Sequence, residues 1–314
     1  MNTINMLSKT QLKKSVASLQ AGRVIAFPTE TVYALAGDAR NILAVKKIFA
    51  LKNRPLNQPL SVLLPENYVL EEWADDISSM ARHLANYFWP GPLTLILKKN
   101  QSVLPELTGG QLKIGLRVPN HPTAQSILKA FSGGLAAPSA NRSTHFSPTQ
   151  AVHVYEEFGD QLDVVDGGDC SIGIESTIVD VTTSIPKIVR LGAISQQAIQ
   201  NVIACEAIQD LQSLAPRKSL MFQQIATTDL QKVIYEYLKQ GKSVTVLARH
   251  TSPIIHKNLS WMTMPAEANL YGQVLYEYLR KAAQNSTDKI LVESIPASEK
   301  WSGVRAALEK YSIT

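Results

Sequence analysis

Two polar side chains stand in a run of small residues near the middle of the chain, Ala-Ala-Pro-Ser-Ala-Asn over 136–141. Small residues let a backbone approach a ligand closely, and Ser139 and Asn141 supply hydrogen-bond donors two residues apart. A turn closed by the asparagine side chain is the structural alternative. The segment is therefore a candidate ligand site, with a plain turn as the competing interpretation.

Two cations lie where a predicted helix must end. Lys52 and Arg54 come just before Pro55, which cannot continue a helix. Cations on a loop, rather than along a helical stripe, suit a polyphosphate. Pairing with the negative end of the helix dipole is the alternative. Lys46 and Lys47 lie on the helix body, and we expect them on a solvated face.

Hydroxyl groups and arginines adjoin other predicted strands. Thr31 follows an apolar run, and α/β sheets bind ligands at the carboxyl ends of their strands. Ser176 and Thr177 begin another strand. Arg117 and Arg190 stand among apolar strand residues, where a cation is costly to bury without an anion. A ligand carboxylate or phosphate would supply that anion, and an internal acidic partner is the ordinary alternative.

The chain lacks the motifs of several common enzyme classes. It has no G-x-S-x-G elbow, no G-x-x-x-x-G-K-[ST] loop and no zinc-binding histidine pair. Cys170 and Cys205 lie far apart and outside any C-x-x-C spacing, so neither a disulfide framework nor a zinc-cysteine site is indicated. What remains is a set of anion-binding donors without an activated nucleophile.

The composition is that of an ordinary globular protein. Its 314 residues are 45% hydrophobic and 18% charged, and 31 Lys+Arg against 26 Asp+Glu give a net charge of +5. This length exceeds what one core usually organises, so we expect two domains. No stretch approaches the roughly 18 apolar residues of a membrane span, and the start lacks the apolar core of a signal peptide. We therefore expect a cytoplasmic protein without membrane contact.

Alternating helix and strand signals predict an α/β fold in two parts. We place a first domain at 1–204, a linker at 205–220 and a second α/β domain with a small parallel sheet at 221–314. In the first part the pattern predicts helices at 10–19, 42–51, 77–88, 122–130 and 149–158, and strands at 23–27, 60–64, 93–97, 114–118, 135–137, near 164, 177–181 and 188–190. In the second part it predicts helices at 229–238, 266–283 and 299–310, and strands at 243–248 and 289–293.

Six motifs follow one another in a recognisable order: F-P-T-E-T-V-Y-A-L, K-N-R-P-L-N-Q-P-L, W-P-G-P-L-T-L-I-L, R-V-P-N-H-P, A-A-P-S-A-N and G-I-E-S-T-I-V-D. In order and spacing they resemble the threonylcarbamoyl-AMP synthases of the YrdC-like family, over roughly residues 10 to 200. The second part, with Leu270 and Tyr271 on an amphipathic helix and Trp301 later, resembles the extra domain of the long, two-domain form more loosely.

The resemblance implies a fold and a reaction. The fold is an open, twisted YrdC-like α/β sheet with a large positive concavity, followed by a smaller C-terminal Rossmann-like α/β domain. The reaction converts L-threonine, bicarbonate and ATP into threonylcarbamoyl-AMP and pyrophosphate, with magnesium accompanying ATP and no protein-bound metal. The link to tRNA is indirect, through a downstream threonylcarbamoyl transferase that modifies an adenosine beside the anticodon.

The resemblance also implies roles for single residues. The family's signature tetrad falls here on four residues that we expect to be catalytic, Lys52, Arg54, Ser139 and Asn141. The nucleotide is expected to contact this tetrad together with Gln58, Ser147 and Arg190. L-Threonine is expected to contact Thr31, Arg117, Ala137, Ser176 and Thr177, with the arginine pairing with its carboxylate.

The chain departs from the family pattern at three places. Ala34 stands where a glycine is common after Val-Tyr, and Gln58 replaces the usual lysine, which removes a positive charge near the phosphates. The usual His-Tyr-Ala-Pro of the linker is Ser-Leu-Ala-Pro at 213–216, so the histidine and the aromatic residue of that segment are missing.

Two other functions compete with the synthase. A module that binds double-stranded RNA or tRNA without turnover would use the same positive concavity. Against it, the charge of +5 is modest and the basic residues are not interleaved with aromatic ones. A relative that acts on a different carbamoyl compound is the third possibility.

Overall fold

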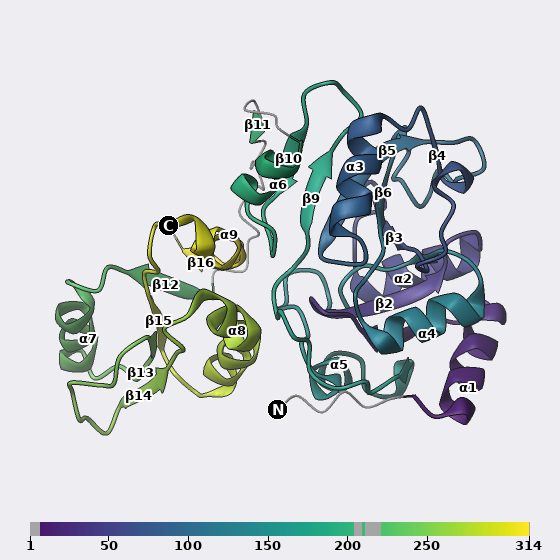
Figure 1. Cartoon of the computed structure of the whole chain (residues 1–314). Helices are drawn as coiled ribbons and strands as arrows, with labels where there is room; N and C mark the ends of the chain where they lie inside the picture. The colour runs from purple at the N-terminus through teal and green to yellow at the C-terminus, as the bar shows by residue number, and fades with distance from the viewer. Residues whose placement is uncertain (1–6, 204–208, 211–220, 314) are drawn as a thin grey trace.

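Two separate β-sheets organise the part of the chain that the computed structural model describes, residues 7–203, 209–210 and 221–313 (Figure 1). The α/β class and the large open sheet followed by a smaller α/β domain are confirmed. Most of the predicted linker lies outside the described residues, as do Cys205 and the Ser-Leu-Ala-Pro segment at 213–216. The domain boundaries at 204 and 221 therefore stay a prediction.

The first unit carries the longer series of elements. In chain order they are α1 (Lys9–Gln20), β1 (Ile25–Pro28), β2 (Tyr33–Asp38), α2 (Ile42–Lys52), β3 (Ser61–Leu63), η1 (Leu70–Glu72), β4 (Ala74–Asp75), α3 (Ser79–Phe88), β5 (Leu93–Lys99), β6 (Lys113–Arg117), α4 (Pro122–Phe131), β7 (Leu135–Ala136), α5 (Ala151–Phe158), η2 (Gly159–Gln161), β8 (Asp163–Val164), β9 (Thr177–Asp180), β10 (Lys187–Arg190), α6 (Gln196–Ile203) and β11 (Gln209–Asp210).

The sheet of the first unit is mixed. Among the described residues its order is β11-β10-β9-β5-β6-β3-β7-β2-β1-β8, with β4 paired to β5. Side chains alternate across it, so that Ile25 and Phe27 pack with residues of α1 and α4, while Ala26 faces the larger core on the other side, with Ile48 of α2. The predicted elements are confirmed, with ends within two residues, but β2, β4, α6 and β11 were not predicted.

The turn between β1 and β2 belongs to a hairpin that sequence reasoning missed. The two strands pair antiparallel, from Ile25 opposite Ala36 to Pro28 opposite Tyr33. Thr29 closes the turn, because its hydroxyl donates to the Val32 carbonyl at 2.7 Å and accepts the Val32 amide at 3.3 Å. The threonine-rich segment after β1 is therefore in part a structural turn.

Helix α2 ends at a defined place, which sets the position of the first predicted cation. The Asn41 side chain caps its first turn, and Asn53 ends it in the left-handed conformation, at φ 49°. Lys52 thus occupies the last helical turn. Lys46 and Lys47 are exposed on the helix body, as predicted.

The second unit is a smaller α/β sandwich. It comprises β12 (Phe222–Ile225), α7 (Leu230–Lys239), β13 (Val244–Ala248), β14 (Leu259–Thr263), α8 (Ala268–Gln284), β15 (Lys289–Glu293), η3 (Glu299–Trp301), α9 (Ser302–Glu309) and β16 (Ser312–Ile313).

All strand pairs of this second sheet are parallel, in the order β14-β13-β15-β12-β16. Val246 packs with residues of α7, and Leu247 packs with residues of α8 and α9. Helix α7 covers one face of the sheet, and α8 and α9 cover the other (Figure 1). The sheet is thus parallel and covered by helices on both faces, as expected of a Rossmann-like domain. Its strand order differs from the usual one, because β15 lies between β12 and β13.

Helices α8 and α9 lie between the second sheet and the first unit (Figure 1). One hydrophobic cluster joins residues of both units, among them Val32, Phe146 and Ile174 of the first. Main chains also approach closely, because a Cβ added at Gly303 of α9 would lie 2.1 Å from the Gly192 carbonyl oxygen. The two units therefore share a packed interface.

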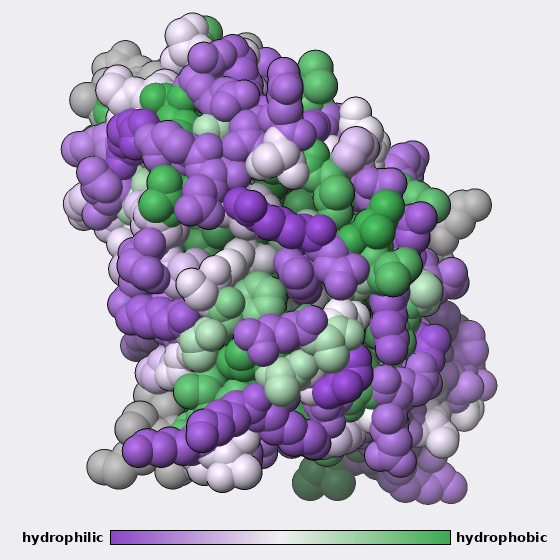
Figure 2. Space-filling view, turned by 90° about the vertical axis from the view of Figure 1, so that its right-hand side faces the viewer, coloured by the Kyte–Doolittle hydropathy of each residue, from purple (hydrophilic) through white to green (hydrophobic). Residues whose placement is uncertain are grey.

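The face of the first unit turned away from the second is mostly hydrophilic, with hydrophobic residues in small groups among the polar ones (Figure 2). None of the described helices combines the length and the hydrophobicity that a membrane crossing requires.

The start of α5 includes a buried histidine. Gln150 precedes the helix without a side-chain cap, and the Thr149 amide donates instead to Nδ1 of His153 at 3.2 Å. Burial lowers the pKa of His153 from 6.5 to about 4, aided by the nearby charge of Arg280. The ring is therefore neutral in the folded protein at neutral pH.

Replacing Gly303 by alanine should loosen the contact between the units. The new methyl group meets main-chain atoms of Gly192, so we expect Gly303→Ala to lower the free energy of unfolding by about 1–3 kcal/mol. Gly272→Ala is the matched control, because its Cβ lies an ordinary 3.4 Å from its nearest neighbour, the Ile172 carbonyl oxygen, and alanine favours the helix. Urea unfolding of both variants checks this. Equal stability of Gly303→Ala and the wild type would contradict it.

Acidification should weaken the fold through His153. Unfolded histidine takes up a proton near pH 6.5, and the folded protein does so only near pH 4. Between these values the unfolded state binds more protons, so the free energy of unfolding falls as the pH falls through this window. His153→Gln should remove that part of the slope, measured by urea unfolding across the window, with the exposed His256→Gln as control. An unchanged slope in His153→Gln would refute the assignment.

Candidate active site

One cavity of the first unit gathers side chains from motifs that are far apart in sequence. It is lined by nine of the twelve predicted site residues: Thr31, Lys52, Arg54, Arg117, Ala137, Ser139, Asn141, Ser176 and Arg190. The other three, Gln58, Ser147 and Thr177, do not line it. The structure thus brings most of the predicted site residues together in one cavity, and their roles stay a prediction.

Lys52 ties the end of α2 to the Ser139 loop. Its side chain is buried, and its Nζ donates to the main-chain carbonyls of Ser139 and of Asn141, the latter at 2.5 Å. In return the Lys52 carbonyl accepts the Ser143 amide at 2.8 Å. The two halves of the predicted tetrad thus contact each other through the lysine ammonium and the loop backbone.

The loop is also attached to β2. Leu35 donates its amide to the Pro138 carbonyl, and the Ala140 amide donates to Tyr33, both at 2.8 Å. The Asn141 side-chain amide donates to the carbonyls of Arg142 and His145, at 2.9 and 2.8 Å. Its buried Oδ1 has no donor among the described residues, and it is an acceptor that a ligand hydroxyl could use.

Arg54 and Gln58 belong to the loop after α2. The Arg54 guanidinium donates to the carbonyls of Gln58 at 3.2 Å and Pro59 at 2.9 Å, which orients it along the cavity wall. Gln58 itself is exposed and contributes only its backbone. Its predicted side-chain contact with the nucleotide has no support in this arrangement.

Arg117 has an internal acidic partner. Its guanidinium lies 2.7 Å from the buried Glu30 carboxylate, donates to the Thr31 hydroxyl at 2.9 Å and donates to the Gly91 carbonyl at 3.1 Å. The internal acidic partner, which was the alternative to a ligand anion for this arginine, is therefore present in the structure. Even so, Arg117 and Thr31 line the cavity side by side.

Ser176 and Thr177 are adjacent in sequence but have different surroundings. The Arg190 guanidinium donates to the Ser176 carbonyl at 2.8 and 3.1 Å and to its hydroxyl at 3.0 Å, and that hydroxyl also contacts Thr94. The Thr177 hydroxyl instead donates to the Ile194 carbonyl and accepts two amides of the same loop. The Thr177 hydroxyl is thus bonded to the backbone, and its expected contact with threonine stays a prediction.

Glu175 and Lys310 line the cavity but were not predicted. The Glu175 carboxylate accepts hydrogen bonds from Ser147 at 3.0 Å, Tyr276 at 2.6 Å and Lys310 at 2.5 Å. Burial opposes its charge, but Lys310 and Arg190 outweigh this and hold the pKa of Glu175 well below its usual range.

This carboxylate also accepts the hydroxyl hydrogen of Ser147, whose expected contact with the nucleotide stays a prediction. Glu175 stands inside the G-I-E-S-T motif and was open to sequence reasoning, whereas Lys310 comes from the second unit and carries no local signal.

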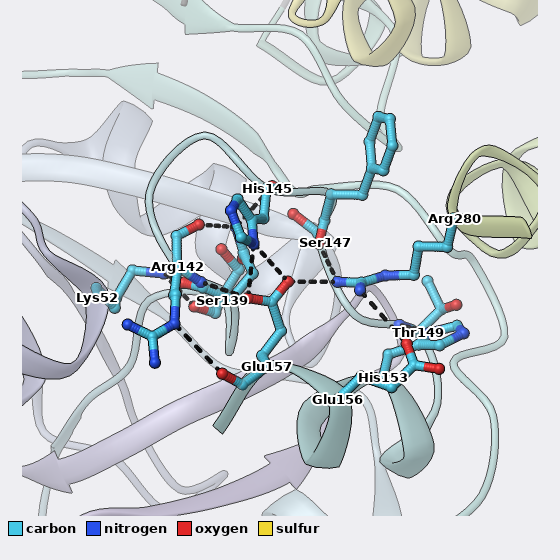
Figure 3. Close-up of polar contacts among 12 residues, drawn as sticks. Lys52, Ser139, Arg142, His145, Ser147, Thr149, His153, Glu156, Glu157 and Arg280 are labelled. Carbon is cyan, nitrogen blue, oxygen red and sulfur yellow. Dashed lines mark hydrogen bonds and ion pairs between the residues drawn. The ribbon is translucent and has the colours of Figure 1, made fainter. Parts of the chain in front are cut away.

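A buried carboxylate on α5 links the Ser139 loop to the second unit (Figure 3). Glu157 lies 2.9 Å from Nδ1 of His145 and 3.1 Å from the Arg280 guanidinium of α8, and it accepts the Arg142 amide at 3.3 Å. Arg280 also donates to the Phe146 carbonyl. Residues 142–147 are thus held by both units.

Two family models and several named relatives match this chain. A family model described as "Telomere recombination" matches residues 17–192, and one described as "Threonylcarbamoyl-AMP synthase, C-terminal domain" matches 212–310. The threonylcarbamoyl-AMP synthase of Bacillus subtilis is 33% identical over 305 residues, which cover 91% of this chain and 88% of that protein. The synthase of Pyrococcus abyssi is 38% identical over 203 residues, which cover 64% and 60%.

A solved structure of a related protein resembles this chain over nearly its whole length. P. abyssi Sua5 complexed with L-threonine superposes with a TM-score of 0.90 at 29% identity, covering 98% of this chain and 96% of that one. The two matched family models and the relative that aligns over 91% of this chain lead to one conclusion: this chain belongs to the threonylcarbamoyl-AMP synthase family, in its two-domain form.

Proposed function

We propose that this chain is an L-threonylcarbamoyladenylate synthase, a nucleotidyltransferase that forms threonylcarbamoyl-AMP and pyrophosphate from L-threonine, bicarbonate and ATP. The observation that carries the proposal is the single cavity in which Lys52, Arg54 and Arg190 lie with Arg117 and neighbouring hydroxyl groups. The relatives named as synthases and the fold shared with the L-threonine complex support it.

The chemistry requires positioning more than a protein nucleophile. The threonine amine combines with bicarbonate to give a carbamate and water, and a carbamate oxygen then attacks the α-phosphorus of ATP. Pyrophosphate leaves in line as the new oxygen–phosphorus bond forms. Charge neutralisation and orientation govern the rate of such a displacement. A cavity rich in cations and hydroxyl groups suits this reaction.

The nucleotide is proposed to lie along the wall formed by Arg54, Ser139 and Arg190. Lys52 places its positive charge in the cavity wall next to the Ser139 loop, and the Oδ1 of Asn141 can accept a ribose hydroxyl. Magnesium is proposed to enter with ATP as part of the substrate. Residues 7–203, 209–210 and 221–313 contain no cluster of three acidic, histidine or cysteine side chains suited to a resident metal.

L-Threonine is proposed to bind beside Arg117. Its carboxylate would compete with Thr31 and Glu30 for the guanidinium, because both now contact the nitrogens that suit a carboxylate. Ser176 and Ala137 line the same cavity. The reactive amine would then face the nucleotide site.

The product would be used by a second enzyme. Threonylcarbamoyl-AMP is an activated mixed anhydride, so we propose that a downstream threonylcarbamoyl transferase passes its acyl group to a tRNA adenosine. The cytoplasm, where tRNA is modified, is the proposed location. The competing RNA-binding module has no comparable support among the relatives, which are named as synthases.

Pyrophosphate release from ATP should require both L-threonine and bicarbonate, with threonylcarbamoyl-AMP detected by mass spectrometry. Lys52→Ala and Arg117→Ala each remove a buried cation. We therefore expect each to lower kcat/KM by a factor that corresponds to a loss of about 2–5 kcal/mol of transition-state stabilisation. That corresponds to roughly 30-fold to several-thousand-fold. Lys47→Ala, at an exposed lysine of the same helix, is the control and should keep full activity. Pyrophosphate release that ignores threonine and bicarbonate would overturn the proposal.

A further inference from the structure

A cation from the second unit takes part in the cavity wall of the first. Lys310 follows α9, yet its side chain lines the same cavity as Ser139 and Arg190. Only 13% of the Lys310 side chain is exposed, and its Nζ lies 2.5 Å from Oε1 of Glu175. The proposed active site is therefore not built from the first unit alone.

The Glu175 carboxylate is enclosed at the junction of the two units. Tyr276 of α8 donates to one of its oxygens, and Ser147 and Lys310 donate to the other. A buried carboxylate is costly unless it is both paired and hydrogen-bonded. Two of these three donors come from the second unit, so that unit holds this charge in place.

Glu175 is linked to Arg190 through Ser176. Ser176 is the next residue, and its carbonyl and hydroxyl accept three hydrogen bonds from the Arg190 guanidinium. Lys310 and Arg190 are also the two cations that stabilise the charge of Glu175. Without Lys310, the carboxylate would attract the guanidinium away from Ser176.

We propose that Lys310 is a positioning residue of the active site, which balances the charge of Glu175 and so keeps Arg190 at Ser176, oriented for the nucleotide. This inference rests on the proposed function, because it gives Lys310 a part in ATP turnover. It assigns the second unit a direct role: supplying the counter-charge for a carboxylate in the wall of the substrate cavity.

Steady-state kinetics of charge variants test the assignment. Lys310→Met should raise KM for ATP by on the order of tenfold to a hundredfold, with a smaller change in KM for threonine, which is bound at Arg117. Lys310→Arg keeps the charge and should restore most of the ATP affinity. Lys232→Met, at an exposed lysine of α7, is the matched control and should leave KM unchanged.

The double variant Glu175→Gln with Lys310→Met separates charge balance from direct contact. A neutral glutamine needs no counter-charge and can still accept from Ser147 or Tyr276, so the double variant should recover at least half of the lost ATP affinity on a logarithmic scale. If it binds ATP as poorly as Lys310→Met, the lysine acts on the ligand itself and the positioning role is wrong. Unchanged kinetics in Lys310→Met would also refute it.

Two controls keep the outcomes distinct. Urea unfolding shows whether Lys310→Met remains folded, and if it does not, the comparison between the double variant and Lys310→Arg decides the question. Wild-type protein is assayed in the same series for threonine- and bicarbonate-dependent pyrophosphate release. If the wild-type protein releases no pyrophosphate, the proposed function is refuted. If the wild type is active and the Lys310 variants have the same KM for ATP, only this inference is refuted.

Discussion

A buried ammonium group at the end of α2 holds the candidate active site together. Lys52 is 2% exposed, and its burial is tolerated because the carbonyls of Ser139 and Asn141 accept its hydrogens. These contacts also fix the loop that carries both residues. A phosphate in the cavity would meet a charge that backbone atoms have already oriented, which is the preorganisation that electrostatic catalysis requires.

Most of the fold could be predicted because hydrophobic runs and helix ends act over short distances. Helix α2 is an example, since Asn41, Asn53 and Pro55 mark both its ends locally. Strand β2 escaped prediction for the opposite reason. Its sequence, Tyr-Ala-Leu-Ala-Gly-Asp, is almost wholly buried, so it shows no alternation of polar and apolar residues that would distinguish a strand.

The candidate site could be predicted only where its residues stand in local motifs. A hydroxyl group in a motif offers the same hydrogen bonds to a ligand and to the protein, so the sequence could not show that Thr177 serves its own backbone or that Ser147 serves Glu175. Lys310 lies 135 positions from the carboxylate it pairs with, and only the packing of the two units brings them together.

The glycine contact between the units limits how they can move. At the contact between Gly303 and Gly192 the main chains lie directly against each other. Neither residue has a side chain that could change its rotamer to let one surface shift along the other. Main-chain atoms of the two units already lie in contact at this point, so any relative motion of the units must draw Gly303 and Gly192 apart and cannot bring them closer.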